Sequence, residues 1–467
     1  MGQTTWASDW GASRRSVWGP FAVSLAGTCC LFGPQAAQAQ TQPQIQTQPQ
    51  PINPDYTSTE ANGPLATNGI DSRSYDRGRN ISVRQRPRPD YEAIGIDLPG
   101  FMIYPKVNLA FAYDSNIFAL HSHQISDGIF TATPEIDFNS KWSRNGLWGF
   151  ARVAQDVYFK NHNENATGFD TGLAGKLQFG NSTLKVGGEF GRFIQPRATS
   201  NNIGLPLHRI PYYYGDVNGQ LTHEFARVRL SARVDYEHFD YKNGHTAAGA
   251  LVFVQDQNHG NLTVVGKAEV AITPDAAVFV SAQGNDRRYD LNPPLVGFTR
   301  NNKGYEVDAG ANFDLTHLLR GEFQIGYLDQ TFSSHLFAPI RGLGGKAQLE
   351  WFPTPLITVT VSGSRTVGDA GVIGSAGYLA SGANLQIDYE LRRNVILTGT
   401  AWVAQDKYNG VDRSDQLGGA SASANWLLNR HLGLTFAYTY YDQSSHGSAA
   451  GPSFNDHRVS LSAIVQY

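Results

Sequence analysis

The stretch from Ser453 to Tyr467 alternates between apolar and polar side chains over its last ten residues. Successive side chains of a strand point to opposite faces, so this period of two predicts a strand whose faces meet different environments. The residues predicted on the apolar face are Val459, Leu461, Ala463, Val465 and Tyr467, and those on the polar face are Arg458, Ser460, Ser462 and Gln466.

The same alternation recurs from Gly100 onwards. Between positions 229 and 237, for example, the even-numbered residues are apolar and the odd-numbered ones are charged or polar. Strands are predicted over 103–113, 129–142, 147–159, 168–180, 184–194, 212–225, 228–241, 257–272, 276–289, 302–315, 321–333, 340–352, 356–368, 377–391, 395–408, 415–428, 432–445 and 453–467. An even number of strands places both chain ends on the same side of a closed barrel.

Short and long connections alternate between these predicted strands. Ser143–Gly146 and Asn429–His431 have the composition of tight turns, whereas Gln195–Ile210, Lys242–Gln255 and Leu291–Asn301 are longer. This alternation is typical of outer-membrane barrels, which have short periplasmic turns and long external loops. We therefore predict an all-β fold: a transmembrane antiparallel up-and-down β-barrel of about 18 strands over residues 101–467. A β-propeller would need four short strands where two long ones are predicted.

Aromatic residues collect near the ends of the predicted strands, and aromatics make up 12% of the chain. Girdles of aromatic residues at both lipid interfaces are a property of membrane barrels. We predict one girdle beside the short turns and one beside the long loops, formed respectively by Trp142, Trp148, Trp351, Phe352 and Trp426, and by Tyr212, Tyr289, Tyr408 and Tyr441.

Residues 1–39 have the pattern of a signal peptide. Arg14 and Arg15 precede an apolar stretch, and Ala37–Ala39 form a small-x-small cleavage site. The two cysteines of the chain, Cys29 and Cys30, lie within this segment. We therefore expect a mature chain that begins near Gln40 and contains neither disulfides nor thiolate metal sites.

Residues 40–100 have the composition of a disordered or extended periplasmic linker. The segment opens with a Gln/Pro/Thr run, and six arginines fall between Arg73 and Arg88. Two interpretations of these arginines remain open. They form a solvated basic segment, or they contact an acidic partner or plug the pore.

The two ends of the predicted barrel carry motifs that resemble those of a known family. The stretch RQRPRPDYEAIGIDLPGFMIYPKVNLAFAYDSNIF begins at Arg84, and the last strand contains Asp456-His457-Arg458. Together they are similar to the putative β-barrel porin 2 family, outer-membrane β-barrel proteins that include exopolysaccharide-associated members. The resemblance implies no catalytic residues. The motif positions are Tyr104, Pro105, Tyr113, Asp114, Asn116 and Asp127.

A barrel of this size encloses a water-filled lumen, which the polar strand faces would line. Both signs of charge occur among these candidates, so mutual pairing across strands is one interpretation and contact with a passing solute is the other. Trp402 could stack on a sugar ring or fill space near a loop. The pore-lining candidates are Arg152, Lys185, Glu189, Arg229, Arg233, Asp235, Glu237, Lys267, Glu269, Arg287, Glu306, Asp308, Lys346, Glu350, Asp388 and Trp402.

Other functions find little support in the sequence. No nucleophile elbow or phosphate-binding loop occurs, and His121 and His123 have no adjacent third metal ligand. We therefore expect no enzymatic activity, cofactor or metal, and the net charge of −3 indicates no nucleic-acid partner.

Three functions remain open for a protein of the bacterial outer membrane surrounded by its lipids. The first is a conduit or accessory in exopolysaccharide export, which would involve periplasmic polysaccharide-export proteins and a polysaccharide. The second is a passive diffusion porin for small solutes. The third is a loop-presenting adhesin or receptor.

Overall fold

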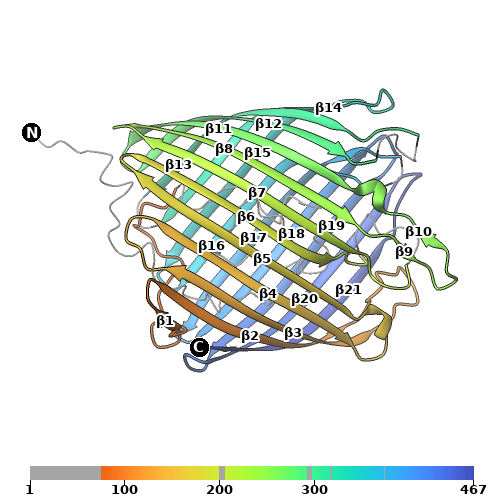
Figure 1. Cartoon of the computed structure of the whole chain (residues 1–467), viewed down its shortest axis with the longest axis horizontal. Helices are drawn as coiled ribbons and strands as arrows, with labels where there is room; N and C mark the ends of the chain where they lie inside the picture. Colours follow the sequence, from red (N-terminus) through yellow and green to blue (C-terminus); the bar gives the residue numbers. More distant parts are fainter. Residues whose placement is uncertain (1–74, 199–205, 292–296, 316–317, 373) are drawn as a thin grey trace, which may run out of the picture.

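The computed structural model describes residues 75–198, 206–291, 297–315, 318–372 and 374–467. Within them, eighteen long strands form a closed antiparallel barrel whose strands are tilted around the wall (Figure 1). The barrel strands are β2 Phe101–Asp114, β3 Asp127–Ser140, β4 Gly146–Tyr158, β5 Ala166–Phe179, β6 Ser182–Ile194, β7 Pro211–Glu224, β8 Val228–Tyr241, β11 His259–Thr273, β12 Ala276–Tyr289, β13 Asn302–Leu315, β14 Leu319–Phe332, β15 Ile340–Thr354, β16 Ile357–Gly368, β17 Gly377–Arg392, β18 Val395–Asn409, β19 Ser414–Leu427, β20 Leu432–His446 and β21 Phe454–Gln466.

Each barrel strand pairs with the next one along the chain, and the last pairs with the first. β8 pairs with β11, and the wall closes between β2 and β21, where Phe111 lies opposite Leu461. Three short strands accompany the barrel: β1 (Ile96–Leu98) pairs with the start of β2, and β9 (Gly244–His245) pairs with β10 (Leu251–Val252). Two single-turn 3₁₀ helices, η2 (His162–Glu164) and η3 (Gln255–Gln257), lie in loops.

The alternation seen in the sequence divides the wall into two faces. On β8, Leu230, Val234 and Tyr236 are exposed on the outside, whereas Asp235 and Glu237 are buried on the inside. This is the reverse of a soluble protein and is the arrangement expected when lipid surrounds the barrel and polar groups fill its interior. None of the helices among the described residues is long and apolar enough to cross a membrane.

The eighteen predicted strands are confirmed, and no predicted bound differs from the observed one by more than two residues. The agreement follows from local signals, because the period of two and the turn residues are both properties of neighbouring positions.

The predicted aromatic girdles are partly wrong. Trp142, Trp351 and Trp426 are about half exposed on the outer face, as expected for an interface. The tyrosines beside the long loops (Tyr212, Tyr289, Tyr408 and Tyr441) are instead buried on the inner face, together with Phe352. They share the parity of the inward polar residues on their strands, and parity decides which face a residue occupies.

Candidate functional site: the barrel lumen

The polar inner wall is held by ion pairs between neighbouring strands. All of the pore-lining candidates from the sequence lie on this inward face. Arg152 Nε of β4 contacts Asp170 Oδ1 of β5 at 2.6 Å, whereas Arg233 Nη2 contacts Asp235 Oδ1 at 2.6 Å within β8. Several candidates pair with acids that were not predicted.

Ion pairs and hydrogen bonds also connect strands that are not neighbours. Lys267 of β11 reaches Glu322 of β14 at 3.0 Å, and Glu269 of β11 accepts a hydrogen bond from Asn312 of β13 at 2.7 Å. Lys346 of β15 lies near Glu306 and Asp308 of β13. A charge network therefore braces this side of the lumen.

A row of three acids crosses the adjoining part of the wall, on the strands that precede β11. Glu189 lies directly opposite Asp216, and Asp216 lies directly opposite Glu237, on the adjacent strands β6, β7 and β8. Neutral donors meet two of them: Asn218 Nδ2 donates to Asp216 at 2.7 Å, and the Tyr214 hydroxyl donates to Glu237 at 3.3 Å. Such a row offers several acceptors to hydroxyl groups or cations in the lumen.

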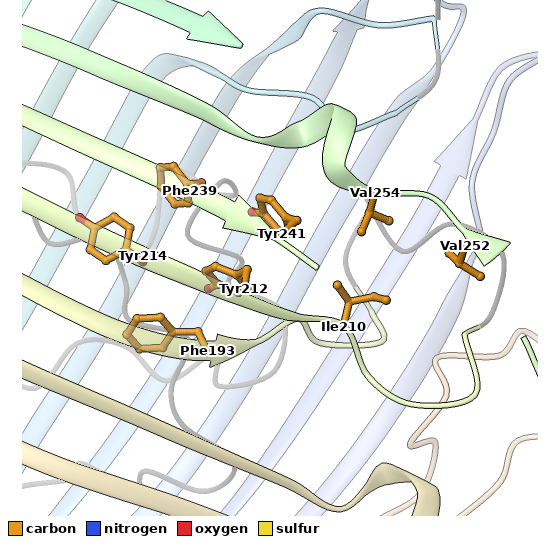
Figure 2. Packing of buried hydrophobic residues seen from close by; sticks show 8 residues of the cluster. All are labelled: Phe193, Ile210, Tyr212, Tyr214, Phe239, Tyr241, Val252 and Val254. Carbon is orange, nitrogen blue, oxygen red and sulfur yellow. The ribbon is translucent and has the colours of Figure 1, made fainter. Parts of the chain in front are cut away.

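At the end of the barrel that carries the long loops, aromatic side chains cover the inner wall (Figure 2). The rings of Tyr212 and Tyr241 stack with centroids 5.0 Å apart, and Tyr214 lies 5.1 Å from Phe239. Loop residues pack on these rings: Ile210, Val252 and Val254. We call the cluster of Phe193, Tyr212, Tyr214, Phe239, Tyr241 and these three aliphatic residues the aromatic floor, because described parts of the loops fold onto it.

Trp402 lies in a second inward cluster and is only 6% exposed. Its ring lies 5.6 Å from Tyr441, and the cluster also contains Phe454 and two loop residues, Ala119 and Ala198. These described loop residues therefore reach the inner wall at this end of the lumen. The packing leaves little of the Trp402 ring open to a sugar.

The loop after β16 also enters the lumen. Asp369 directly follows that strand and lies 3.2 Å from Arg287 of β12. It also accepts a hydrogen bond from the hydroxyl group of Tyr289. Arg287 was predicted as a pore-lining residue, but its partner was not, because Asp369 lies in a loop where parity gives no information.

At the end that carries the short turns, residues 75–93 lie along the inner wall, and we call them the strap. The Tyr75 hydroxyl donates to Glu350 at 2.7 Å, and Gln348 Nε2 donates to that hydroxyl at 2.6 Å. The Arg77 amide and Asn80 Nδ2 donate to the two oxygens of Asp314 at 3.0 and 2.9 Å. Its first half therefore binds β13 and β15.

The arginines of the strap pair with acids farther round the wall. Arg84 Nε donates to Asp388 at 2.6 Å, and Arg86 and Arg88 both reach Glu390 Oε2, at 3.0 and 2.9 Å. Burial lowers the pKa of Arg88, and the Glu390 carboxylate opposes that shift. Since a guanidinium group stays charged in proteins, burying it requires such a partner.

The strap differs from the disordered or extended linker predicted over residues 40–100. Residues 40–74 of that range, Arg73 among them, lie outside the described residues. The described part is fixed to the wall, because buried acids of the inner face need cationic and hydrogen-bonding partners. Candidates Glu350 and Asp388 hold the strap. Asp314, Arg320 and Glu390 take part as well, and their inward parity is the signal that could have identified them.

Two of the family-motif positions, Asp114 and Asn116, lie at the seam where the barrel closes. Asn116 donates to the carbonyl oxygens of Leu120 and Asn455, both at 2.9 Å, and Asp114 accepts from the Asn116 amide at 2.9 Å. Asp127 accepts from the amide of Asn161 at 2.8 Å. Asn116 thus ties the first loop to the last strand, and Asp127 ties the start of β3 to the loop after β4, so these motif positions have a structural role.

The other motif positions have different surroundings. Tyr104 is buried beside Gly95, Pro105 accepts a hydrogen bond from the Tyr467 amide, and Tyr113 is exposed on the outer face. His121 contacts the Ser453 carbonyl oxygen at 3.0 Å. In the described part of the chain, no group of three or more His, Cys, Asp or Glu residues is arranged to hold a metal ion.

Comparison with known proteins gives one family match and several distant structural matches. The family model described as putative beta-barrel porin 2 matches residues 88–467. The search of curated proteins finds no match.

Three solved structures illustrate the structural matches, each covering 78% of this chain. A mutant of the ferric enterobactin receptor PfeA from Pseudomonas aeruginosa is 10% identical, with a TM-score of 0.44 and 80% of that chain covered. The siderophore receptor PirA from Acinetobacter baumannii is 7% identical, with a TM-score of 0.42 and 80% covered. OpdL from Pseudomonas aeruginosa is 12% identical, with a TM-score of 0.41 and 99% covered. Scores this low support no inference about the present chain.

Proposed function

Because the chain belongs to the putative beta-barrel porin 2 family, we propose that it forms a pore for polar solutes in the bacterial outer membrane. The observation that carries this proposal is the reversal of polarity across a closed wall. Apolar side chains are exposed outside, and paired charges of both signs lie inside. A wall of this kind suits hydrophilic solutes and discriminates only modestly between anions and cations.

Conductance of the purified protein in planar lipid bilayers tests the pore. We expect discrete ion-conducting steps, with a smaller conductance than an unobstructed barrel because the strap and the loops occupy both ends of the lumen. A second preparation should lack residues 40–93. If neither preparation conducts, although both show the heat-modifiable migration of a folded barrel, the proposal is wrong.

A conduit in exopolysaccharide export is a second candidate. What supports it is the resemblance to exopolysaccharide-associated family members, together with a lumen in which many charges are paired and aromatic rings are mostly covered. Such a wall would let a polar polymer slide without strong adhesion.

Polysaccharide distribution in a deletion strain distinguishes the two candidates. Loss of polymer from the medium and cell surface, with retention in the periplasm or arrested synthesis, would support export. Normal secretion combined with slower uptake of small solutes would contradict export and favour passive diffusion.

A further inference from the structure

We propose that the strap forms part of the pore wall and sets the ion selectivity of the pore by neutralising an acidic arc beneath it. The acidic arc consists of Asp314, Glu350, Asp388 and Glu390, which lie on the inward face of β13, β15 and β17. This inference rests on the proposed pore and concerns which residues determine its selectivity.

The acids of the arc have few cationic partners on the wall itself. Among the described residues, Arg320 of β14 pairs with Glu350 at 2.7 Å, and Arg393, in the turn after β17, reaches Glu390 at 3.4 Å. For Asp388, the ion pair that the structure gives is with Arg84 of the strap. The cations that offset the arc therefore come mainly from the strap.

The sequence of the strap matches this role. It contains five arginines against three acids, Asp76, Asp90 and Glu92. Its contacts extend along one side of the barrel, from Asp314 on β13 to Gln466 on β21, whose side chain donates to the Tyr91 carbonyl oxygen at 3.4 Å. A solute that enters on this side meets the strap in place of the strands.

Fixed charges at a narrow point determine which ions enter a pore. With the strap in place, the arc and the arginines offset each other. If the arginines lose their charge, the acidic arc is no longer neutralised and should attract mobile cations in their place. If instead the arc loses its charge, the strap has an excess of arginines and should attract anions.

Reversal potentials across bilayers that separate two KCl concentrations test both directions with the full chain. We expect R84Q/R86Q/R88Q to raise the potassium-to-chloride permeability ratio by about three-fold or more, and D388N/E390Q to lower it by a similar factor. The matched control, R144Q/R288Q/R341Q, removes the same number of charges from exposed positions outside the lumen and should leave the ratio unchanged.

The outcomes separate this inference from the proposed pore. Clear conductance with the same ratio in all variants would overturn the inference and leave the pore intact. Absence of conductance in every folded variant and in the unaltered chain would overturn both. If the arginine variant does not fold, D388N/E390Q still decides, because an unchanged or increased ratio there contradicts the inference.

Discussion

At the scale of single residues, the face of the barrel on which a side chain lies decides what it does. Tyr212 and Tyr236 are both strand tyrosines, yet the first is buried in the aromatic floor and the second is exposed on the outer surface. Counting parity from a neighbouring charged residue predicts this difference. The position of a residue near the end of a strand does not by itself predict its face, which is why the predicted girdle beside the long loops was wrong.

Arg320 joins wall and strap at the short-turn end through several polar contacts. It is fully buried, pairs with Glu350 through two nitrogens, and also contacts Asp76 and the Asn80 carbonyl oxygen. We expect R320A to destabilise the barrel by about 3–5 kcal/mol, because it leaves a buried carboxylate without its cation.

Urea unfolding of the protein in lipid vesicles measures the loss. The outer-face variant R341A provides the control, since Arg341 is more than half exposed. A loss for R320A that does not exceed the control would contradict the role assigned to Arg320.

At the scale of elements, the strands could be predicted from the sequence and the strap could not. Each strand follows from alternation within about a dozen neighbouring residues. The strap depends on partners such as Glu350 and Asp388, hundreds of positions away along the chain. Parity predicted that these acids lie inside, but nothing local indicates which segment covers them. The sequence likewise does not indicate which loop residues pack against the inner wall, because their partners are also distant along the chain.

A pair of cysteines tests the position of the strap. Asn80 and Asp314 are hydrogen-bonded through their side chains, so a short bis-methanethiosulfonate reagent should join the two thiols of the double variant N80C/D314C through disulfides. The predicted loss of Cys29 and Cys30 with the signal peptide leaves no competing thiols.

Migration on non-reducing gels, with and without reductant, detects the cross-link. The pair N80C/T435C, in which the second cysteine lies on β20, should not be joined. Equal cross-linking of the two pairs would mean that the strap is not held at β13.

The seam between β2 and β21 is the second element-scale feature that can be tested. Asn116 donates to two carbonyl oxygens and accepts from the Leu120 amide. We expect N116A to lower stability by about 1–3 kcal/mol, because the carbonyl and amide groups lose their buried partner.

The temperature at which the folded form disappears on gels measures this change, with N163A, an exposed loop residue, as control. Equal temperatures for the two variants would show that the motif does not hold the seam.

At the scale of the whole molecule, the barrel carries apolar side chains outside and polar ones inside, so an added charge should destabilise the outer face more than the inner face. Val234 is exposed near the middle of β8, whereas Thr263 lies on the inward face of the adjacent strand β11. We expect V234R to cost about 2–4 kcal/mol, since the lipid face does not tolerate a cation at mid-depth.

The substitution T263R should cost less, because the lumen holds water and Asp235 lies directly opposite. Unfolding in vesicles of defined lipid gives both values. A larger loss for T263R than for V234R would contradict the assignment of the faces.

The strap also has a consequence for the order in which the barrel assembles. It precedes the short strand β1 and the first barrel strand, yet its partners lie on β13 to β21, so binding brings the beginning of the barrel close to its last strands. Closing a long loop costs conformational entropy. If the strap binds the last strands early, it holds the two ends of the barrel close together and so lowers the entropy cost of the final β2–β21 pairing. A chain without the strap should therefore reach the same closed wall more slowly, so that the segment inside the finished pore also serves as an aid to its folding.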